Sequence, residues 1–254
     1  MYQTVMLKME KRSIQEEINK RKGEDRNLTE NIIELKNIQK YYPMGRDRLH
    51  VLKSIDLKIK KGDFLMIVGQ SGSGKTTLLN ILGFLDKFDE GNYLYKGDDV
   101  TNLDEKQRSR FRNTNIGFVF QQFNLIPTLD IYKNIELPMI YNDKYSKEEK
   151  DKRIKERLKM VGLLDKIHQK PLELSGGQQQ RITIARALVN DPDIIFADEP
   201  TGALDTDTSR DIMELLKDLN EKGKTIIMVT HEPDLLKYAT QVIRLRNGVV
   251  IEEV

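Results

Sequence analysis

The chain has 254 residues, which is enough to bury a sizeable core and suggests one domain, or one domain with a subdomain. Its 42 basic and 40 acidic residues leave a net charge of +2, so nothing in the charge points to a nucleic acid as partner. There is no cysteine and no apolar run near the roughly 18 residues that cross a bilayer, so we expect neither disulfides, thiolate metal sites nor a transmembrane helix, and we expect a cytoplasmic location.

The first part of the chain is densely charged. Residues 1–30 contain seven Lys or Arg and six Asp or Glu among scattered apolar side chains. Mixed charge at this density is typical of a solvated helix or a disordered arm. We therefore assign residues 1–31 to an N-terminal extension and residues 32–254 to the folded domain.

Two strands are predicted at the start of the folded domain, Ile32–Ile38 and Val51–Ile59. In the second, apolar residues alternate with charged ones, as a half-solvated antiparallel sheet requires. The run Tyr41–Gly45 is predicted as the loop between them.

A glycine-rich stretch, Gly69–Thr76, follows the apolar run Phe64–Val68 and precedes a predicted helix. A strand, a glycine loop and a helix are the context in which G-x-x-x-x-G-K-[ST] forms a phosphate site. The loop turns its N–H groups inward, and the helix N-terminus adds partial positive charge. Lys75 is placed to reach the β- and γ-phosphates, and the Thr76 hydroxyl to ligate Mg²⁺. The predicted binding residues of this stretch are Gly69, Gln70, Ser71, Gly72, Ser73, Gly74, Lys75, Thr76 and Thr77.

Three later runs share the fully apolar character of 64–68: Ile116–Phe120, Ile194–Ala197 and Ile226–Val229. Helical stretches alternate with them. This alternation predicts an α/β core with a mostly parallel sheet.

Residues 122–173 contain no comparable strand. Within them, the capping-box pattern Ser146–Glu149 precedes Ile154, Leu158 and Val161 at helical spacing. We therefore predict an α-helical subdomain, about residues 122–173, inserted into the α/β core.

The sequence Leu174–Gln178 precedes a further predicted helix, Gln179–Val189. A serine and two glycines before a helix make a second anion-binding N-terminus. An ordinary serine-capped helix is the simpler alternative. Because the lysine-bearing loop already serves the phosphates of one nucleotide, we predict that this second helix end serves the nucleotide of another subunit. The residues involved are Ser175, Gly176, Gly177 and Gln178.

Two adjacent carboxylates, Asp198 and Glu199, end the apolar strand Ile194–Ala197, at the edge where open α/β sheets bind ligands. Successive strand side chains point in opposite directions, so the two have different roles. Asp198 is predicted to hold Mg²⁺ through water, and Glu199 to face the nucleotide and polarise an attacking water. A solvated acidic turn is the alternative, and the apolar residues before the pair argue against it.

The C-terminal part predicts a core-facing amphipathic helix and a hairpin. Asn247-Gly248 separates the two strands of the hairpin, Val242–Arg246 and Val249–Ile251. Asn-Gly between alternating runs is a strong signal for a tight turn.

Residues 32–251 as a whole resemble the nucleotide-binding subunit of an ATP-binding cassette (ABC) transporter. The resemblance implies a P-loop NTPase core with an N-terminal antiparallel β subdomain and an inserted α-helical subdomain. It implies an ATP hydrolase that uses ATP and Mg²⁺. The matching motifs are Walker A at Gly69–Thr76, the Q-loop glutamine Gln121, the signature Leu174–Gln178, Walker B at Ile194–Glu199, the D-loop Ala203–Asp205 and the switch histidine His231.

The resemblance also implies residue roles. Tyr42 would stack on adenine, with Tyr41 as the neighbouring alternative and a packed loop tyrosine as the other reading. Gln121 would touch Mg²⁺ and the attacking water, and report the state of the nucleotide to a membrane partner. Asp205 would lie across a dimer seam, and His231 would contact the γ-phosphate.

The family picture is a head-to-tail dimer in which Walker A of one subunit and the signature of the other enclose ATP. ATP favours the closed form of such a dimer. The implied partners are a second ATPase subunit and integral membrane permease subunits, which would hold the chain peripherally at the inner face of the cell membrane. Residues near 122–140 are expected to form part of the groove that receives the permease.

The sequences 118–127, 174–181 and 200–205 resemble the MacB/LolD-type group of macrolide and peptide exporters, lipoprotein-release ATPases and antimicrobial-peptide resistance modules. The extension before residue 32 departs from that group. Two alternatives stay open: a cell-division-type regulator that drives a periplasmic hydrolase, and a non-membrane ABC ATPase. The latter usually carries a long coiled coil or two cassettes, and neither is present.

Overall fold

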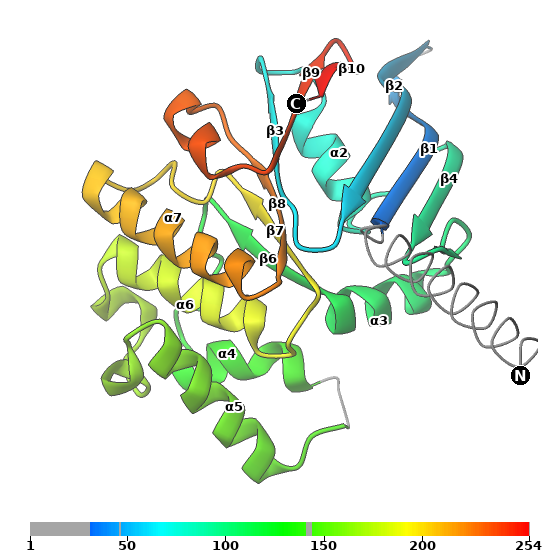
Figure 1. The fold of residues 1–254 in the computed structure, drawn as a ribbon. Helices are drawn as coiled ribbons and strands as arrows, with labels where there is room; N and C mark the ends of the chain where they lie inside the picture. The colour runs from blue at the N-terminus through cyan, green and yellow to red at the C-terminus, as the bar shows by residue number, and fades with distance from the viewer. Residues whose placement is uncertain (1–30, 46, 141–143, 254) are drawn as a thin grey trace, which may run out of the picture.

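The computed structural model describes residues 31–45, 47–140 and 144–253, which form two β-sheets with helices around them (Figure 1). The expected extension, residues 1–31, lies outside the described residues except for Asn31, the first residue of β1. None of the helices described is both long and apolar enough to serve as a membrane span.

The first sheet is antiparallel and has the order β2-β1-β4-β5. Its strands are β1 (Asn31–Met44), β2 (Asp47–Lys60), β4 (Glu90–Tyr95) and β5 (Asp98–Asp99). β1 and β2 form a long hairpin whose register runs from Asn31 opposite Lys60 to Met44 opposite Asp47.

The prediction of a loop at Tyr41–Gly45 was therefore wrong, because β1 continues to Met44. Pro43 is tolerated there because pairing between β1 and β4 ends at Gln39 and Glu90, which leaves this part of β1 paired on one side only. The hairpin brings Tyr42 to a fixed position on a strand instead of a loop.

The second sheet has the order β10-β9-β3-β8-β7-β6 and is parallel except for the β9–β10 pair, which confirms the predicted mostly parallel core. Asn247 and Gly248 both have positive φ, 51° and 80°, in the predicted turn between β9 and β10. The strands are β3 (Phe64–Gly69), β6 (Ile116–Phe120), β7 (Ile194–Asp198), β8 (Thr225–Val229), β9 (Gln241–Arg246) and β10 (Val249–Glu253).

Helices cover both faces of this parallel sheet (Figure 1). α2 (Lys75–Leu82) buries its apolar residues between the two sheets, in a cluster with β1, β2 and β4. α6 (Gly176–Leu188) and α7 (Thr206–Glu221) pack on the opposite face, against side chains such as Met66 and Met228. The loops at the carboxyl ends of β3, β7 and β8 therefore meet at one edge.

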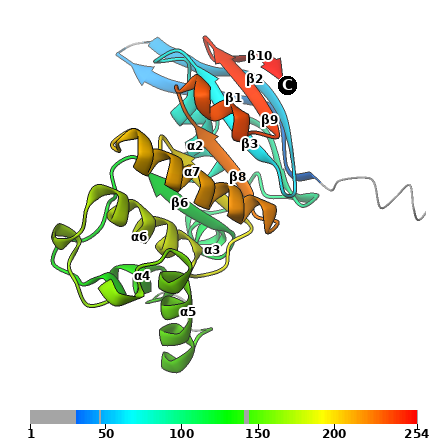
Figure 2. The ribbon, with the colours of Figure 1, turned by 60° about the vertical axis from the view of Figure 1, so that its left-hand side comes forward.

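A separate helical unit lies beyond α6 (Figure 2). It contains α4 (Ile131–Ile140) and α5 (Lys147–Met160), and α5 begins at the predicted capping box, with Ser146 and Glu149 bonded to each other's backbone N–H. Their hydrophobic cluster includes Ile182 and Ala185 of α6 and Val189, the residue that follows α6. The helical unit is thus joined to the sheet through α6.

α6 itself begins at Gly176, three residues before the predicted start at Gln179. The cause is the Ser175 cap, which fixes the first turn on the two glycines despite their low helix propensity. One helix, α3 (Glu105–Asn115), lies between β5 and β6 and packs against β6.

Candidate active site

The N-terminus of α2 has no side chain that caps its backbone N–H groups. Its N-cap is Gly74, at φ 103°, and no side chain caps it. α3, α5, α6 and α7, in contrast, each begin with an Asp or Ser side chain that accepts from a backbone N–H. The first N–H groups of α2 are therefore donors that only a ligand or water can satisfy.

The loop before α2 is built around close backbone contacts. Gly69 has φ 153°, and a Cβ there would lie 2.2 Å from the carbonyl oxygen of Leu245. Lys75 Nζ donates to the carbonyl oxygens of Gly69 and Gln70, at 2.9 and 3.0 Å. The ammonium group is thus held over the loop, beside the uncapped N–H groups.

These hydrogen-bond donors fit the phosphates of a nucleoside triphosphate. The helix end and Lys75 supply positive charge without a carboxylate bound to either. Ser73 Oγ is buried, and no other atom in the described part of the chain forms a hydrogen bond with it. Such a buried hydroxyl is a donor in reserve for a ligand oxygen.

A pocket of about 450 Å³ lies at this helix end. The hairpin of the first sheet, the glycine loop and the ends of β7 and β8 all contribute to it. Val51 is the one lining residue that was not predicted from the sequence, since its apolar side chain carries no chemical signal. The lining residues are Tyr42, Val51, Gly69, Ser71, Gly72, Gly74, Lys75, Thr76, Thr77, Glu199 and His231.

The acidic residues lie at the carboxyl end of β7. Glu199 has φ 46°, unusual for a residue other than glycine, and its Oε1 lies 3.1 Å from His231 Nδ1. Burial raises the pKa of the Asp198 carboxyl, the neighbouring Glu199 charge adds to this, and Lys75 acts in the opposite direction. Asp198 therefore lies within electrostatic reach of the lysine of the loop.

Tyr42 is held at the other end of the pocket. Its hydroxyl donates to Asp86 Oδ2, while Lys40 Nζ lies 2.9 Å from Asp86 Oδ1 and 4.7 Å from the Tyr42 ring centroid. Burial and the hydrogen bond to Asp86 raise the pKa of the Tyr42 hydroxyl. Tyr41 instead stacks on His50, with ring centroids 4.2 Å apart. Of the two tyrosines, Tyr42 is the one that lines the pocket.

Lys40 and Asp86, the residues that hold Tyr42 in place, were not predicted from the sequence. Lys40 could have been found, since residues two apart on a strand share a face. Asp86 could not, because it follows α2 and reaches Tyr42 only in the folded chain.

The signature residues do not line the pocket. Ser175 and Gln178 form a capping box in which each side chain accepts from the other's backbone N–H, at 3.3 and 3.0 Å. Ser175 only accepts in this arrangement, so its hydroxyl proton stays available to a ligand. Gly177 packs closely on α7, where an added Cβ would lie 2.3 Å from Thr208 Cγ2.

The remaining predicted residues also lie outside the pocket. Asp205 caps α7 by accepting from the N–H and hydroxyl of Thr208, and these bonds lower the pKa of its carboxyl. Gln121 is exposed beyond β6, and its Nε2 would lie 2.8 Å from a Cβ added to Gly202. Gln70 faces a second cavity.

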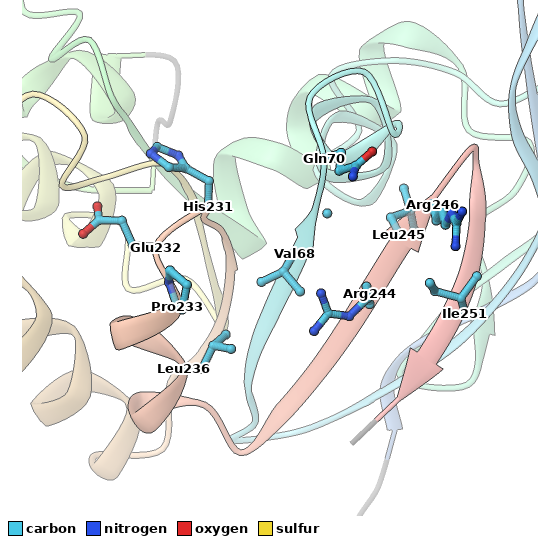
Figure 3. Close-up of a pocket in the computed structure, with 11 residues that line it drawn as sticks. Val68, Gln70, His231, Glu232, Pro233, Leu236, Arg244, Leu245, Arg246 and Ile251 are labelled. Carbon is cyan, nitrogen blue, oxygen red and sulfur yellow. The ribbon is translucent and has the colours of Figure 1, made fainter.

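That second cavity, of about 500 Å³, adjoins the first and shares Gly69 and His231 with it (Figure 3). Figure 3 shows Arg244 on β9 and Pro233 and Leu236 after β8 along its walls. It contains neither Lys75 nor Glu199, both of which line the smaller pocket, so the smaller pocket is the better candidate for phosphate binding. Asp198, at the end of β7, lines neither cavity.

Comparison with known proteins agrees with this geometry. The family model described as "ABC transporter" matches residues 52–202. An uncharacterised ABC transporter ATP-binding protein of Methanocaldococcus jannaschii, MJ1508, is 52% identical over 87% of this chain and 98% of its own length. The macrolide export ATP-binding/permease protein MacB of Bdellovibrio bacteriovorus is 49% identical, over 86% of this chain and 33% of its own length.

A solved structure gives the same result for the fold. The ATP-binding cassette MJ0796, in a dimeric post-hydrolysis state with ADP and Pi, superposes with a TM-score of 0.79 and 48% identity, over 87% of this chain and 97% of that one. The two-sheet fold and the motifs thus agree with a cassette that turns over ATP. The chain belongs to the ABC transporter family as one of its ATP-binding cassettes, and it is an ATP hydrolase.

Proposed function

We propose that two copies of this chain associate head to tail on ATP and that their cycle drives a separate membrane permease of the MacB/LolD type. Localisation at the inner face of the cell membrane, through the permease, follows from this proposal. The observation that carries it is the unequal pair of helix N-termini. The α2 end opens into a pocket with Lys75, Glu199 and His231, whereas the Ser175 end of α6 is exposed and outside that pocket.

Within one subunit, the α2 end and Lys75 bind the phosphates, and Tyr42 packs on the base. Mg²⁺, held by Thr76, Asp198 and Gln121 together with phosphate oxygens, would neutralise charge on the transferred group. Within residues 31–45, 47–140 and 144–253, no cluster of three or more His, Cys, Asp or Glu side chains could hold a metal by itself. A site of this kind needs none, since Mg²⁺ is commonly bound by one or two carboxylates and substrate phosphates.

Glu199 acts as the general base. It accepts a proton from the attacking water at Oε1 or Oε2, while His231 Nδ1 holds the carboxylate at 3.1 Å. The strained φ of 46° keeps this carboxylate turned toward the pocket that it lines. Hydrolysis needs a second subunit, because Ser175 of the same chain is too far from the pocket to line it.

A groove of about 340 Å³ between α3, β6, α4 and α6 supports the permease as partner. Its residues include Leu85, Phe118, Pro138 and Asn190, and it reaches Phe120, next to Gln121. Leu85 is 45% exposed, and Phe118 and Pro138 also line the groove, so an apolar helix would fit. Of the stretch expected here, residues 122–140, Pro138 lines the groove.

The test is co-purification of tagged chain from detergent-solubilised membranes. We expect a permease to co-purify, and Leu85→Asp to lower its yield. Leu164→Asp is the matched control, because Leu164 is similarly exposed, at 41%, but lies away from the groove in the short helix η1 (Leu164–Lys166). Absence of any permease, or equal loss with both variants, would contradict the proposal. A periplasmic hydrolase recovered with the permease would favour the cell-division-type alternative.

A further inference from the structure

One buried side chain connects three of the motifs that surround the active site. Gln180 lies on the second turn of α6 and is completely buried. Its Nε2 donates to the carbonyl oxygens of Phe120 and Pro200, at 3.2 and 2.6 Å. The first carbonyl precedes Gln121, and the second follows Glu199. The helix that starts at Ser175 is thus bonded to both loops.

The orientation of this amide is fixed by its surroundings. Both acceptors are carbonyl oxygens, so only the NH₂ group of Gln180 can face them. Its Oε1 lies 3.1 Å from the hydroxyl of Thr183, which is also completely buried. The single Thr183 hydroxyl proton is shared with the Gln180 backbone carbonyl oxygen, at 2.8 Å, whereas the amide group of Gln180 has two carbonyl acceptors.

The two loops are also in contact with each other. The backbone N–H of Gly202 donates a hydrogen bond to the carbonyl oxygen of Glu199, at 3.0 Å, and closes a turn. The exposed side chain of Gln121 packs on Gly202. Thr201, in the same turn, donates to Glu232 Oε1 at 3.1 Å, beside His231. A displacement of the Phe120 or Pro200 carbonyl therefore moves the residues on which hydrolysis depends.

We propose that Gln180 is a positioning residue for hydrolysis: its two N–H bonds hold the backbone at Gln121 and Glu199 in register with the signature helix. The inference rests on the roles proposed above for Gln121 and Glu199. It does not involve the phosphate loop, because Gln180 makes no bond to Gly69–Thr76. Loss of the two bonds should therefore lower kcat and leave ATP binding unchanged.

The first test is Gln180→Met, which keeps the length of the side chain and removes both donors. We expect kcat for ATP to fall roughly tenfold, as two buried hydrogen bonds would allow, with KM for ATP within about twofold of wild type. Gln179→Met is the matched control, because Gln179 directly precedes Gln180 and its amide donates to the carbonyl oxygen of Leu174, which belongs to neither loop. Activity is normalised to the folded fraction from thermal unfolding.

The second test separates the positioning role of Gln180 from its packing in the core. It also keeps the proposal testable if Gln180→Met does not fold. In Gln180→Glu, a buried carboxylate faces two carbonyl oxygens, which raises its pKa. The protonated form can donate one of the two bonds, so the activity of this variant relative to wild type should rise as the pH falls from 8 to 6. Thr183→Val leaves both N–H bonds intact and should retain most of the activity.

Two results would overturn the inference: kcat of Gln180→Met within twofold of wild type, or a pH profile of Gln180→Glu that parallels wild type. Normal hydrolysis by Glu199→Gln would instead contradict the proposed role of Glu199. The two failures are therefore distinguishable.

Discussion

Two helices of this chain, α2 and α6, begin with glycine-rich sequences. They differ in which groups accept hydrogen bonds from the backbone N–H groups of their first turns. The α2 end has no side-chain cap and opens into a pocket with Lys75 and Glu199. The α6 end is closed by the reciprocal bonds of Ser175 and Gln178, and it faces solvent. One end is a nearly complete anion site, and the other is a stable helix start with one hydroxyl proton to offer.

The difference shows how two glycine-rich helix starts can serve the two roles proposed for them in one small domain. An uncapped end leaves its N–H groups to water or a ligand, so it suits a position where a pocket can hold a ligand. A capped end is stable without a ligand, so it can bind one that another molecule presents. Substitutions at each of the two ends can test this division.

The largest effect is expected from Lys75→Ala. Removal of the ammonium group over the α2 end should lower ATP hydrolysis by roughly 1,000-fold and abolish ATP-dependent dimerisation. Phosphate release and light scattering with and without ATP measure the two effects. Lys61→Ala, at an exposed surface lysine, is the control. Dimers that still form with ATP would show that the two ends do not share a nucleotide.

Glu199→Gln should separate binding from chemistry. The amide can keep a hydrogen bond to His231 but cannot accept the proton, so hydrolysis should fall by at least roughly 100-fold. ATP-bound dimers should then accumulate, which light scattering would detect. A variant that stays monomeric in ATP argues against the shared site, and Glu214→Gln, on α7, should behave as wild type.

Ser175→Asp tests the α6 end directly. Aspartate caps a helix as well as serine does, so the free energy of unfolding should change little. The added negative charge should weaken ATP-dependent dimerisation by roughly 100-fold or more, while nucleotide binding by the monomer is kept. Ser146→Asp, in the equivalent capping box of α5, is the matched control. Equal dimerisation by both variants would remove α6 from the site.

Tyr42→Ala should weaken nucleotide binding by about 1–3 kcal/mol through the loss of stacking on the base. Tyr42→Phe should retain most of the affinity although it loses the bond to Asp86. Tyr41→Ala is the control, because that ring stacks on His50 away from the pocket. Fluorescence titration with a nucleotide analogue gives the affinities, and a larger loss for Tyr41→Ala would reverse the assignment.

The smallest effect concerns stability without nucleotide. Burial raises the pKa of Asp198, so the folded chain binds this proton more readily than the unfolded chain and its charged form is unfavourable at neutral pH. Asp198→Asn should raise the free energy of unfolding at pH 7, by less than about 1 kcal/mol because the carboxyl is only half buried. The gain should disappear as the pH falls through the raised pKa. Thermal unfolding of both proteins at pH 7 and at a pH below the raised pKa measures this difference in stability.

The sequence predicted the elements whose signals are local. The strands at 64–68 and 194–197, the Asn247-Gly248 turn and the Ser146 cap all follow from neighbouring residues, and the structure confirms them. The loop predicted at Tyr41–Gly45 was wrong because strand pairing with β2 overrides the local preference of Pro43 and Gly45 for a turn. The early start of α6 was missed because the cap outweighs the weak helix propensity of two glycines.

By itself, the sequence determined the local motifs, because a glycine loop, an acidic strand end and a capped helix each depend on a few consecutive residues. Only the tertiary structure decided which of them meet. His231 reaches Glu199 because β8 lies between β3 and β7, and Asp86 holds Tyr42 across 44 residues of chain. Such contacts depend on sheet order and helix packing, in which each element is placed by burial against many others and not by its own sequence.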